Sequence, residues 1–164
     1  MKAIVVYESL WGNTAAIARA IAEGIGPEAQ ALSTAEATAA ELAGADLIVA
    51  GAPVHAFSLP TESSRRNAGG NAGKAPAPDL SHPPMREWLG RLTPGQGRCA
   101  AFETAFRWSP SGATGRIASG FQRAGYRPVA KAHRFIVTGG NGPLRAGEVE
   151  KARAWGAELA RSIG

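Results

Sequence analysis

Cysteine is nearly absent from this chain, because Cys99 is the single one among 164 residues. One cysteine excludes an internal disulfide and any metal site built from cysteines. Cys99 falls inside a predicted central strand, where we expect a buried, inert thiol rather than a nucleophile. The three histidines (His55, His82 and His133) lack metal-ligand spacing, and we expect no specific role for His82, which lies beside two prolines. The sequence thus predicts no metal site and no catalytic side chains.

Long hydrophobic runs are also missing. A segment that crosses a bilayer needs about 20 apolar residues, and the chain has no such run. Lys2 is followed by an apolar stretch of only strand length, which is too short for a signal peptide. We therefore expect a cytoplasmic protein without membrane insertion. The length suits one domain covering residues 1–164.

Charge is sparse and unevenly spread along the chain. Residues 1–60 carry two basic and six acidic side chains, whereas residues 61–164 carry sixteen basic and seven acidic ones. This asymmetry predicts a basic face that attracts an anionic partner or substrate. The chain lacks the basic runs and aromatic-rich motifs that are typical of nucleic-acid binding, so nucleic acid is not expected as a partner.

Strand and helix patterns alternate along the chain. The predicted strands cover about residues 2–8, 29–32, 46–51, 98–103 and 127–137. The predicted helices cover about residues 13–24, 34–44, 85–92, 113–124 and 146–162. Such alternation requires a parallel sheet with helices on both faces, which is an α/β fold. Ligands of these folds bind beyond the carboxyl ends of the strands, where the strand order reverses.

The turn after the first strand has the composition of an anion site. Ser9, Asn13 and Thr14 offer side-chain donors, and the helix that follows presents free backbone N–H groups and its positive dipole end. No lysine or arginine lies within the turn, so a phosphate there is bound by dipoles and hydroxyls. Neither the nucleotide P-loop nor the dinucleotide fingerprint is present. Hydroxyl and amide residues also serve as ordinary turn and N-cap residues, which is the alternative.

The segment 5–21 resembles the signature of the flavodoxin family. Its specified positions are filled by Val5, Val6, Tyr7, Ser9, Gly12, Thr14, Ala18 and Ile21. The resemblance implies a flavodoxin-like three-layer sandwich of the short-chain type, with a five-stranded parallel sheet in the order 2-1-3-4-5. It also implies that FMN binds without a covalent bond, its phosphate held by the turn residues Ser9, Leu10, Trp11, Gly12, Asn13 and Thr14.

Two further loops resemble the segments that bracket the flavin in this family. After the third strand come Pro53, Val54, His55, Ala56 and Phe57, of which His55 or Phe57 is expected to cover one ring face. After the fourth strand come Glu103, Thr104, Ala105, Phe106, Arg107 and Trp108, and here Phe106 and Trp108 are the stacking candidates. Trp11 is placed to shield the flavin edge.

Two stretches depart from the family pattern. Residues 61–84 form a long segment rich in Gly, Pro and Ala, without a periodic apolar face, that carries Arg65, Arg66 and Lys74. We expect either a basic lid or docking loop or a disordered insertion. Residues 138–147 form a Gly-rich turn that is expected to be a connector.

The resemblance implies electron transfer through the isoalloxazine ring. We expect a redox partner protein or a small anionic substrate to dock on the basic face formed by Arg65, Arg66, Lys74 and Arg107. One alternative is an FMN-dependent oxidoreductase acting on a quinone, a porphyrinogen or NAD(P)H. Another is a flavodoxin-fold binding module that works without FMN. The family's electron carriers are typically acidic, so the basic balance of this chain is a departure.

Overall fold

The central sheet is parallel, and its strands follow the predicted order. A computed structural model describes residues 1–55, 57–70 and 77–164. Its strands are β1 (Ala3–Tyr7), β2 (Ala29–Ser33), β3 (Leu47–Pro53), β4 (Arg98–Ala105), β5 (Arg127–Pro128) and β6 (His133–Ile136). They pair in the order β2-β1-β3-β4-β5, and β6 also pairs with β4. The predicted order 2-1-3-4-5 is confirmed, and it places the carboxyl ends of β1 and β3 side by side.

The predicted fifth strand is split in two. Residues 127–137 were expected to be continuous, but β5 and β6 are separate, and both lie along β4. Pro128 has no N–H to offer to the ladder, and pairing resumes only at His133. The split leaves the carboxyl end of β6 level with the end of β4, because Ile136 lies opposite Ala105.

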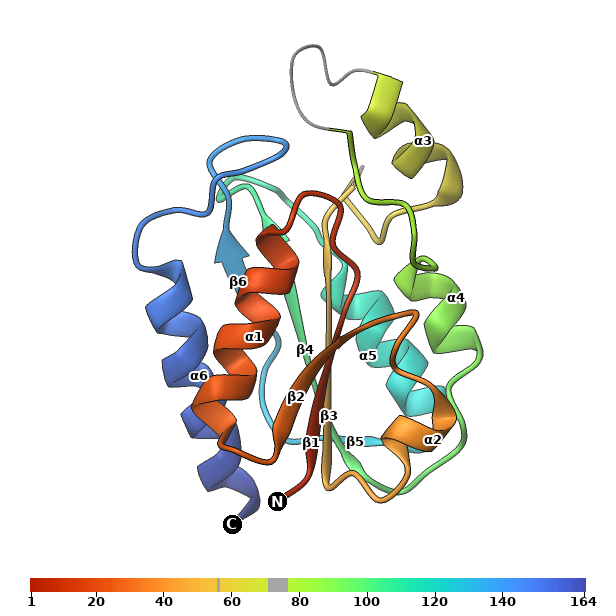
Figure 1. Cartoon of the computed structure of the whole chain (residues 1–164), viewed down its shortest axis with the longest axis vertical. Helices are drawn as coiled ribbons and strands as arrows, with labels where there is room; N and C mark the ends of the chain where they lie inside the picture. Colours follow the sequence, from red (N-terminus) through yellow and green to blue (C-terminus); the bar gives the residue numbers. More distant parts are fainter. Residues whose placement is uncertain (56, 71–76) are drawn as a thin grey trace.

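Helices cover both faces of the sheet, as Figure 1 shows. One face carries α1 (Asn13–Ile25) and α6 (Glu148–Ile163), and the other carries α2 (Ala39–Leu42), α4 (Met85–Gly90) and α5 (Thr114–Arg123). The strand residues alternate between two cores: Val5 and Val49 face α1 and α6, whereas Val6 and Ala50 face α4 and α5. This is the expected three-layer sandwich.

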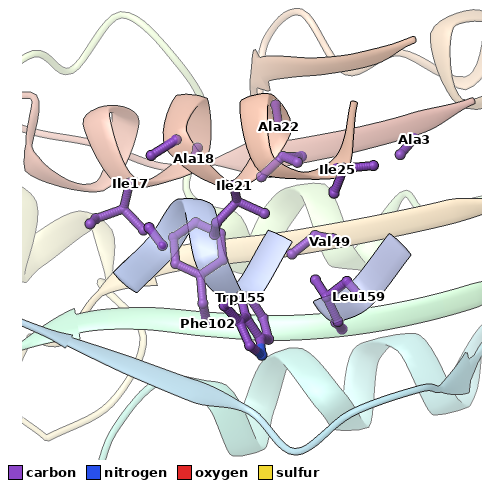
Figure 2. Close-up of a cluster of buried hydrophobic side chains, with 14 of the residues drawn as sticks. Ala3, Ile17, Ala18, Ile21, Ala22, Ile25, Val49, Phe102, Trp155 and Leu159 are labelled. Atoms are coloured by element: carbon purple, nitrogen blue, oxygen red, sulfur yellow. The ribbon is translucent and has the colours of Figure 1, made fainter. Parts of the chain in front are cut away.

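The core under α1 and α6 is closed by a tight contact between these two helices. Figure 2 shows Ile17, Ile21 and Ile25 of α1 beside Trp155 and Leu159 of α6, over the strands. Gly24 and Gly156 lie where the two helix backbones meet: a Cβ on Gly156 would stand 2.2 Å from the carbonyl oxygen of Ile21. The contact fixes the position of α1, whose first residues follow the predicted anion turn.

One predicted helix is shorter than expected, and one predicted loop contains a helix. The helix expected over 34–44 is reduced to Ala39–Leu42, because Thr38 caps it by accepting the N–H of Glu41 at 3.4 Å. The segment 61–84, expected to lack regular structure, contains α3 (Glu62–Gly70). Thr61 and Ser64 bond to each other's backbone N–H, in the manner of a capping box. Figure 1 places α3 beyond the carboxyl ends of the strands.

Candidate functional site

The turn between β1 and α1 is organised around the hydroxyl of Ser9. Its Oγ accepts the N–H of Gly12 at 3.1 Å and the N–H of Ala15 at 3.2 Å. Gly12 has a left-handed backbone (φ 92°), a conformation that favours glycine. Ser9 and Thr14 are buried, whereas Gly12 is exposed. The turn therefore presents the start of α1 to the carboxyl edge of the sheet.

Four segments line one pocket at this edge. Its lining residues are Ser9, Leu10, Trp11, Asn13, Thr14, Pro53, Val54, His55, Thr104, Ala105, Phe106, Val137, Gly139 and Gly140. The three segments predicted from the sequence meet here, and the 138–147 segment joins them. The enclosed volume is about 40 Å³, room for a few water-sized groups. A small anionic group fits within it, whereas a larger ring must lie across its rim.

Hydrogen bonds and close contacts tie these segments together. The hydroxyls of Thr14 and Thr104 lie 2.8 Å apart, which joins the turn to the end of β4. The N–H of Val54 donates to the Thr104 carbonyl at 3.0 Å. A Cβ on Gly142 would stand 2.7 Å from the amide of Asn13, so this backbone packs directly against the turn. The 138–147 segment is therefore part of the pocket wall as well as a connector.

The loop after β3 presents its two ring candidates differently. His55 lines the pocket, and its Nδ1 lies 3.2 Å from the Ser64 hydroxyl of α3. Burial, helped by the charge of Arg65, lowers the pKa of His55 and favours the neutral ring. Phe57 is 51% exposed and has φ 63°, a conformation that is rare for a bulky residue. Its carbonyl accepts the Ser111 hydroxyl at 2.8 Å, which holds the turn. Ala56 lies outside the described residues.

The end of β4 contributes Thr104 and Ala105 to the pocket, and the loop after it contributes Phe106. The rings of Phe106 and Trp108 stack, with centroids 5.1 Å apart and planes 11° from parallel. Trp108 is 69% exposed, so the pair extends from the pocket to the surface. Arg107 between them is exposed.

Glu103 is turned away from this pocket. Its Oε2 accepts the N–H groups of Ala113 and Thr114 at 2.7 and 3.1 Å, where α5 begins. Its Oε1 accepts Nε of Arg134 at 2.6 Å. The carboxylate thus satisfies the start of α5, and any contact with a ligand is left to the Glu103 backbone.

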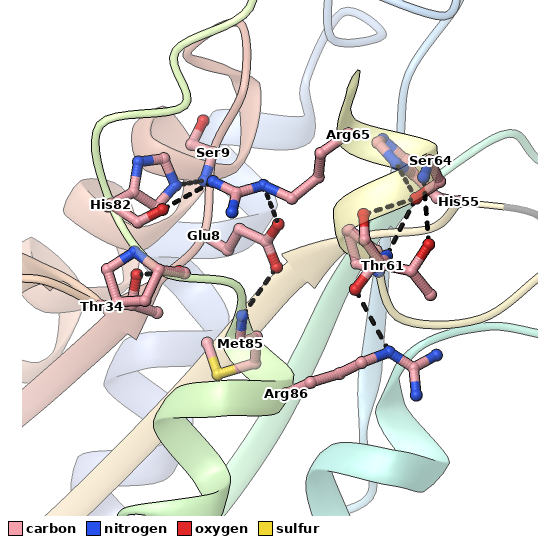
Figure 3. Close-up of polar contacts among 12 residues, drawn as sticks. Glu8, Ser9, Thr34, His55, Thr61, Ser64, Arg65, His82, Met85 and Arg86 are labelled. Carbon is pink, nitrogen blue, oxygen red and sulfur yellow. Dashed lines mark hydrogen bonds and ion pairs between the residues drawn. The ribbon is translucent and has the colours of Figure 1, made fainter. Parts of the chain in front are cut away.

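A buried polar cluster lies behind the turn, as Figure 3 shows. Glu8 is 0% and Arg65 is 6% exposed, and Arg65 Nε lies 3.2 Å from Glu8 Oε2. The Arg65 guanidinium also donates to the carbonyl of His82 at 2.7 Å. The ring Nε2 of His82 accepts the N–H of Ser9 at 3.1 Å. Burial and the Arg65 charge lower the pKa of His82, which fits this acceptor role.

This cluster corrects two predictions. Arg65 does not belong to an exposed basic face, because it is buried against Glu8. His82 has a specific role, because it holds the first N–H of the turn. Arg66 and Arg107 are exposed as expected, and Lys74 lies outside the described residues. The capping pair Thr61 and Ser64 was the one sequence feature that pointed to α3.

Other predictions about the site concern sulfur, metals and membranes. Cys99 is buried, as expected, and burial raises the pKa of its thiol to about 11. Among the described residues, no group of three or more His, Cys, Asp or Glu side chains is placed to hold a metal ion. Within the same ranges, no helix has the length and apolar character needed to cross a membrane.

The family model for a flavodoxin domain matches residues 4–65, which include the turn and the loop after β3. A flavodoxin from the domain Archaea has a similar structure, with a TM-score of 0.70, 25% identity and 99% of each chain covered. Oxidised flavodoxin 1 from Bacillus cereus gives a TM-score of 0.67 at 18% identity, with 98% of each chain covered. A short-chain flavodoxin associated with a PDU bacterial microcompartment gives 0.68 at 12% identity over 100% of both chains. No curated protein sequence matches the chain.

The sequence match and the likeness of fold support assignment of the chain to the flavodoxin family. The match covers residues 4–65, which include the turn, and the likeness of fold extends over nearly the whole chain. In general terms this is a family of electron-transfer flavoproteins, so the comparisons support a flavoprotein that moves electrons.

Proposed function

We propose that this protein binds FMN non-covalently at the pocket between β1, β3, β4 and β6 and carries electrons through it. The main support is the convergence on one pocket of the flavodoxin-like turn with the loops after β3 and β4. The pocket lies at the carboxyl ends of β1 and β3, where the strand order reverses. Its donors suit a phosphate, and its apolar members suit a flat ring.

The residues of the pocket divide between these two tasks. The Thr14 hydroxyl, the Asn13 amide and the free N–H groups at the start of α1 would hold the phosphate, and Ser9 would keep the turn in shape. The ring would lie across the rim, between His55 and the stacked pair of Phe106 and Trp108. The cofactor supplies the redox chemistry, and the chain binds it and sets its potential.

The absorption spectrum of the purified protein tests this proposal. We expect the protein mixed with FMN and then desalted to keep one flavin per chain, with visible absorption and quenched flavin fluorescence. Quenching follows from the aromatic side chains at the rim. Riboflavin, which lacks the phosphate, is the matched control and should be lost on desalting. A protein that stays colourless after incubation with FMN would instead support the binding module without FMN.

We further propose that the partner is an acidic redox protein of the cytoplasm. Arg66 and Arg107 are exposed, and neither side chain has an ion pair within the described part of the chain. Arg107 follows the pocket residue Phe106 in the loop after β4, and Arg66 lies in α3, whose Ser64 contacts the pocket residue His55. Basic side chains at a docking surface attract an acidic partner and speed the encounter.

An oxidoreductase is the second candidate function, and the same two arginines favour it. A guanidinium beside the rim can hold a carboxylate or phosphate of a small substrate. Anaerobic mixing with NADPH or NADH separates the two functions. Direct bleaching of the flavin, faster than reduction through a separate reductase, would support the enzyme. Slow bleaching would support the carrier.

The basic surface gives a prediction for the reduction potential. Positive charge near the ring stabilises the electrons that it receives, so we expect a less negative potential than that of acidic flavodoxins. Arg107→Glu should lower the potential by tens of millivolts, on the order of the interaction of exposed charges across solvent. Arg161→Glu, at the far end of α6, is the matched control and should leave it nearly unchanged. A spectroelectrochemical titration in which both variants shift equally would contradict the prediction.

A further inference from the structure

The turn between β1 and α1 contains no lysine or arginine, but the fold places the guanidinium of Arg65 behind it. Arg65 of α3 and Glu8 at the end of β1 are buried together, and Glu8 immediately precedes Ser9 (Figure 3). Their closest contact, 3.2 Å from Nε to Oε2, lacks hydrogen-bond geometry, so both atoms are buried without a hydrogen-bond partner in the described structure. Unsatisfied buried polar atoms are costly. A buried pair in this arrangement calls for an explanation.

The groups around Glu8 leave its charge finely balanced. Oε1 accepts the N–H of Met85 at 2.9 Å, and Arg65 and Arg86 add positive charge from α3 and α4. Burial opposes these groups and prevails, which raises the pKa of Glu8 to about 7. Near neutral pH, the carboxyl is therefore close to half protonated.

Three other ionisable groups are affected by the Arg65 charge. His55, in the loop after β3, has a pKa lowered by burial and by that charge, and His82 and Asp79 belong to the segment before α4. His82 accepts from Ser9 N–H and from the Arg65 guanidinium through its carbonyl, and its pKa is lowered. Asp79 lies 3.9 Å from His82 Nδ1, is exposed, and has a lowered pKa because Ser81 donates to it. Because all three pKa values are lowered, His55 and His82 stay mainly neutral and Asp79 stays ionised above a pH of about 6.5. Glu8 is then the group whose ionisation changes beside the turn.

We propose that Glu8 and Arg65 form a proton-controlled countercharge for the phosphate bound by the turn, an inference that rests on the proposed FMN site. With Glu8 ionised, the pair is neutral. With Glu8 protonated, no negative charge compensates Arg65. Its positive charge then attracts the phosphate on the other side of the Ser9 backbone. An anion therefore binds more tightly to the protonated form, and its binding draws a proton onto Glu8.

The sign of the pH dependence follows from this linkage. FMN affinity should fall as pH rises through about 7, and it should level off once Glu8 is ionised in both free and bound protein. Between about pH 6.5 and 8.5 the phosphate of FMN is itself mainly a dianion, so its own titration contributes little. We expect a decrease of roughly fivefold over this range, with up to one proton taken up per FMN near pH 7.

Two variants test the proposal from opposite sides. Glu8→Gln keeps an acceptor for the Met85 N–H and fixes the charge at +1, so at pH 8.5 it should bind FMN roughly fivefold more tightly than the unmodified protein. Arg65→Met removes the cation, so at pH 6.5 it should bind roughly fivefold more weakly. Glu8→Gln should lose the pH dependence. Arg65→Met should move it to higher pH, because the pKa of Glu8 rises further without the Arg65 charge. A purely structural role would instead weaken FMN binding in both variants at every pH.

Calorimetry of FMN binding in buffers of different ionisation enthalpy measures both affinity and proton uptake. Carboxyl-carbon NMR of Glu8 adds a readout on the unmodified protein that does not depend on the variants folding. The titration midpoint of the Glu8 carboxyl should lie near pH 7 without ligand. It should rise with FMN but not with riboflavin. Tight FMN binding with no proton uptake and no shift of Glu8 would overturn this inference alone. Absence of any FMN binding would overturn it together with the proposed function.

Discussion

Replacing Ser9 and Thr14 together by alanine should lower FMN affinity by about a hundredfold or more. Ser9 Oγ accepts the N–H groups of Gly12 and Ala15 and so shapes the turn. The Thr14 hydroxyl, bonded to Thr104, stands at the first turn of α1, where the phosphate is proposed to bind. A hydrogen bond from Thr14 to the charged phosphate contributes about 1.5–3 kcal/mol, and the two N–H bonds that Ser9 accepts contribute about 1 kcal/mol each. Their combined loss corresponds to about two orders of magnitude or more.

Fluorescence titration with FMN measures this effect, and riboflavin provides the matched ligand. Because riboflavin has no phosphate, its weaker binding should change little in the double variant. Urea unfolding of the FMN-free protein separates a loss of binding from a loss of fold. Unchanged FMN affinity in a folded double variant would refute the phosphate site at this turn.

Gly156→Ala should lower the free energy of unfolding by about 3 kcal/mol, at the upper end of overpacking changes. A Cβ at this position would stand 2.2 Å from the Ile21 carbonyl oxygen and 3.1 Å from the Ile25 nitrogen, so α1 and α6 would have to separate. Backbone atoms cannot swing aside as the end of a side chain can. Since α1 begins at the anion turn, we also expect FMN affinity to fall.

Gly115→Ala is the control for this substitution. Gly115 lies in α5 with no neighbouring atom within 4 Å of an added Cβ, so alanine there should be neutral or slightly stabilising through its better helix propensity. Urea denaturation of both variants measures the difference. Equal stability of the two would show that α1 and α6 are not in backbone contact at Gly156.

The sequence was sufficient for the architecture and for most of the pocket. Alternation of apolar strands with amphipathic helices fixes a parallel three-layer fold, because each crossover must return to the same edge. The positions of Ser9 to Thr14, of Pro53 and of Thr104 follow from this, since each lies at or just beyond the carboxyl end of a strand. The strand order and the grouping of these residues into one site came from the resemblance of segment 5–21 to the flavodoxin signature.

What the sequence could not show depended on contacts between distant segments. The partner of Arg65 is Glu8, 57 positions earlier in the chain, and only the folded chain reveals that this arginine is buried. The ring of His82 reaches Ser9, 73 positions earlier. In residues 61–84 the high content of glycine and proline concealed a helix, and nothing local indicated that Glu103 would cap α5 instead of facing the pocket.

The burial of Cys99 and Met85 affects how readily this protein is oxidised when it works in air. Reduced flavins react with oxygen to give peroxide, and peroxide attacks thiolates and accessible thioethers. Cys99 is 3% exposed with its thiol pKa raised to about 11, and Met85 is fully enclosed. Of the three sulfur atoms in the chain, only that of the terminal methionine, 38% exposed, is open to this damage. If the proposed flavin is bound, repeated aerobic turnover should therefore leave Cys99 and Met85 unoxidised.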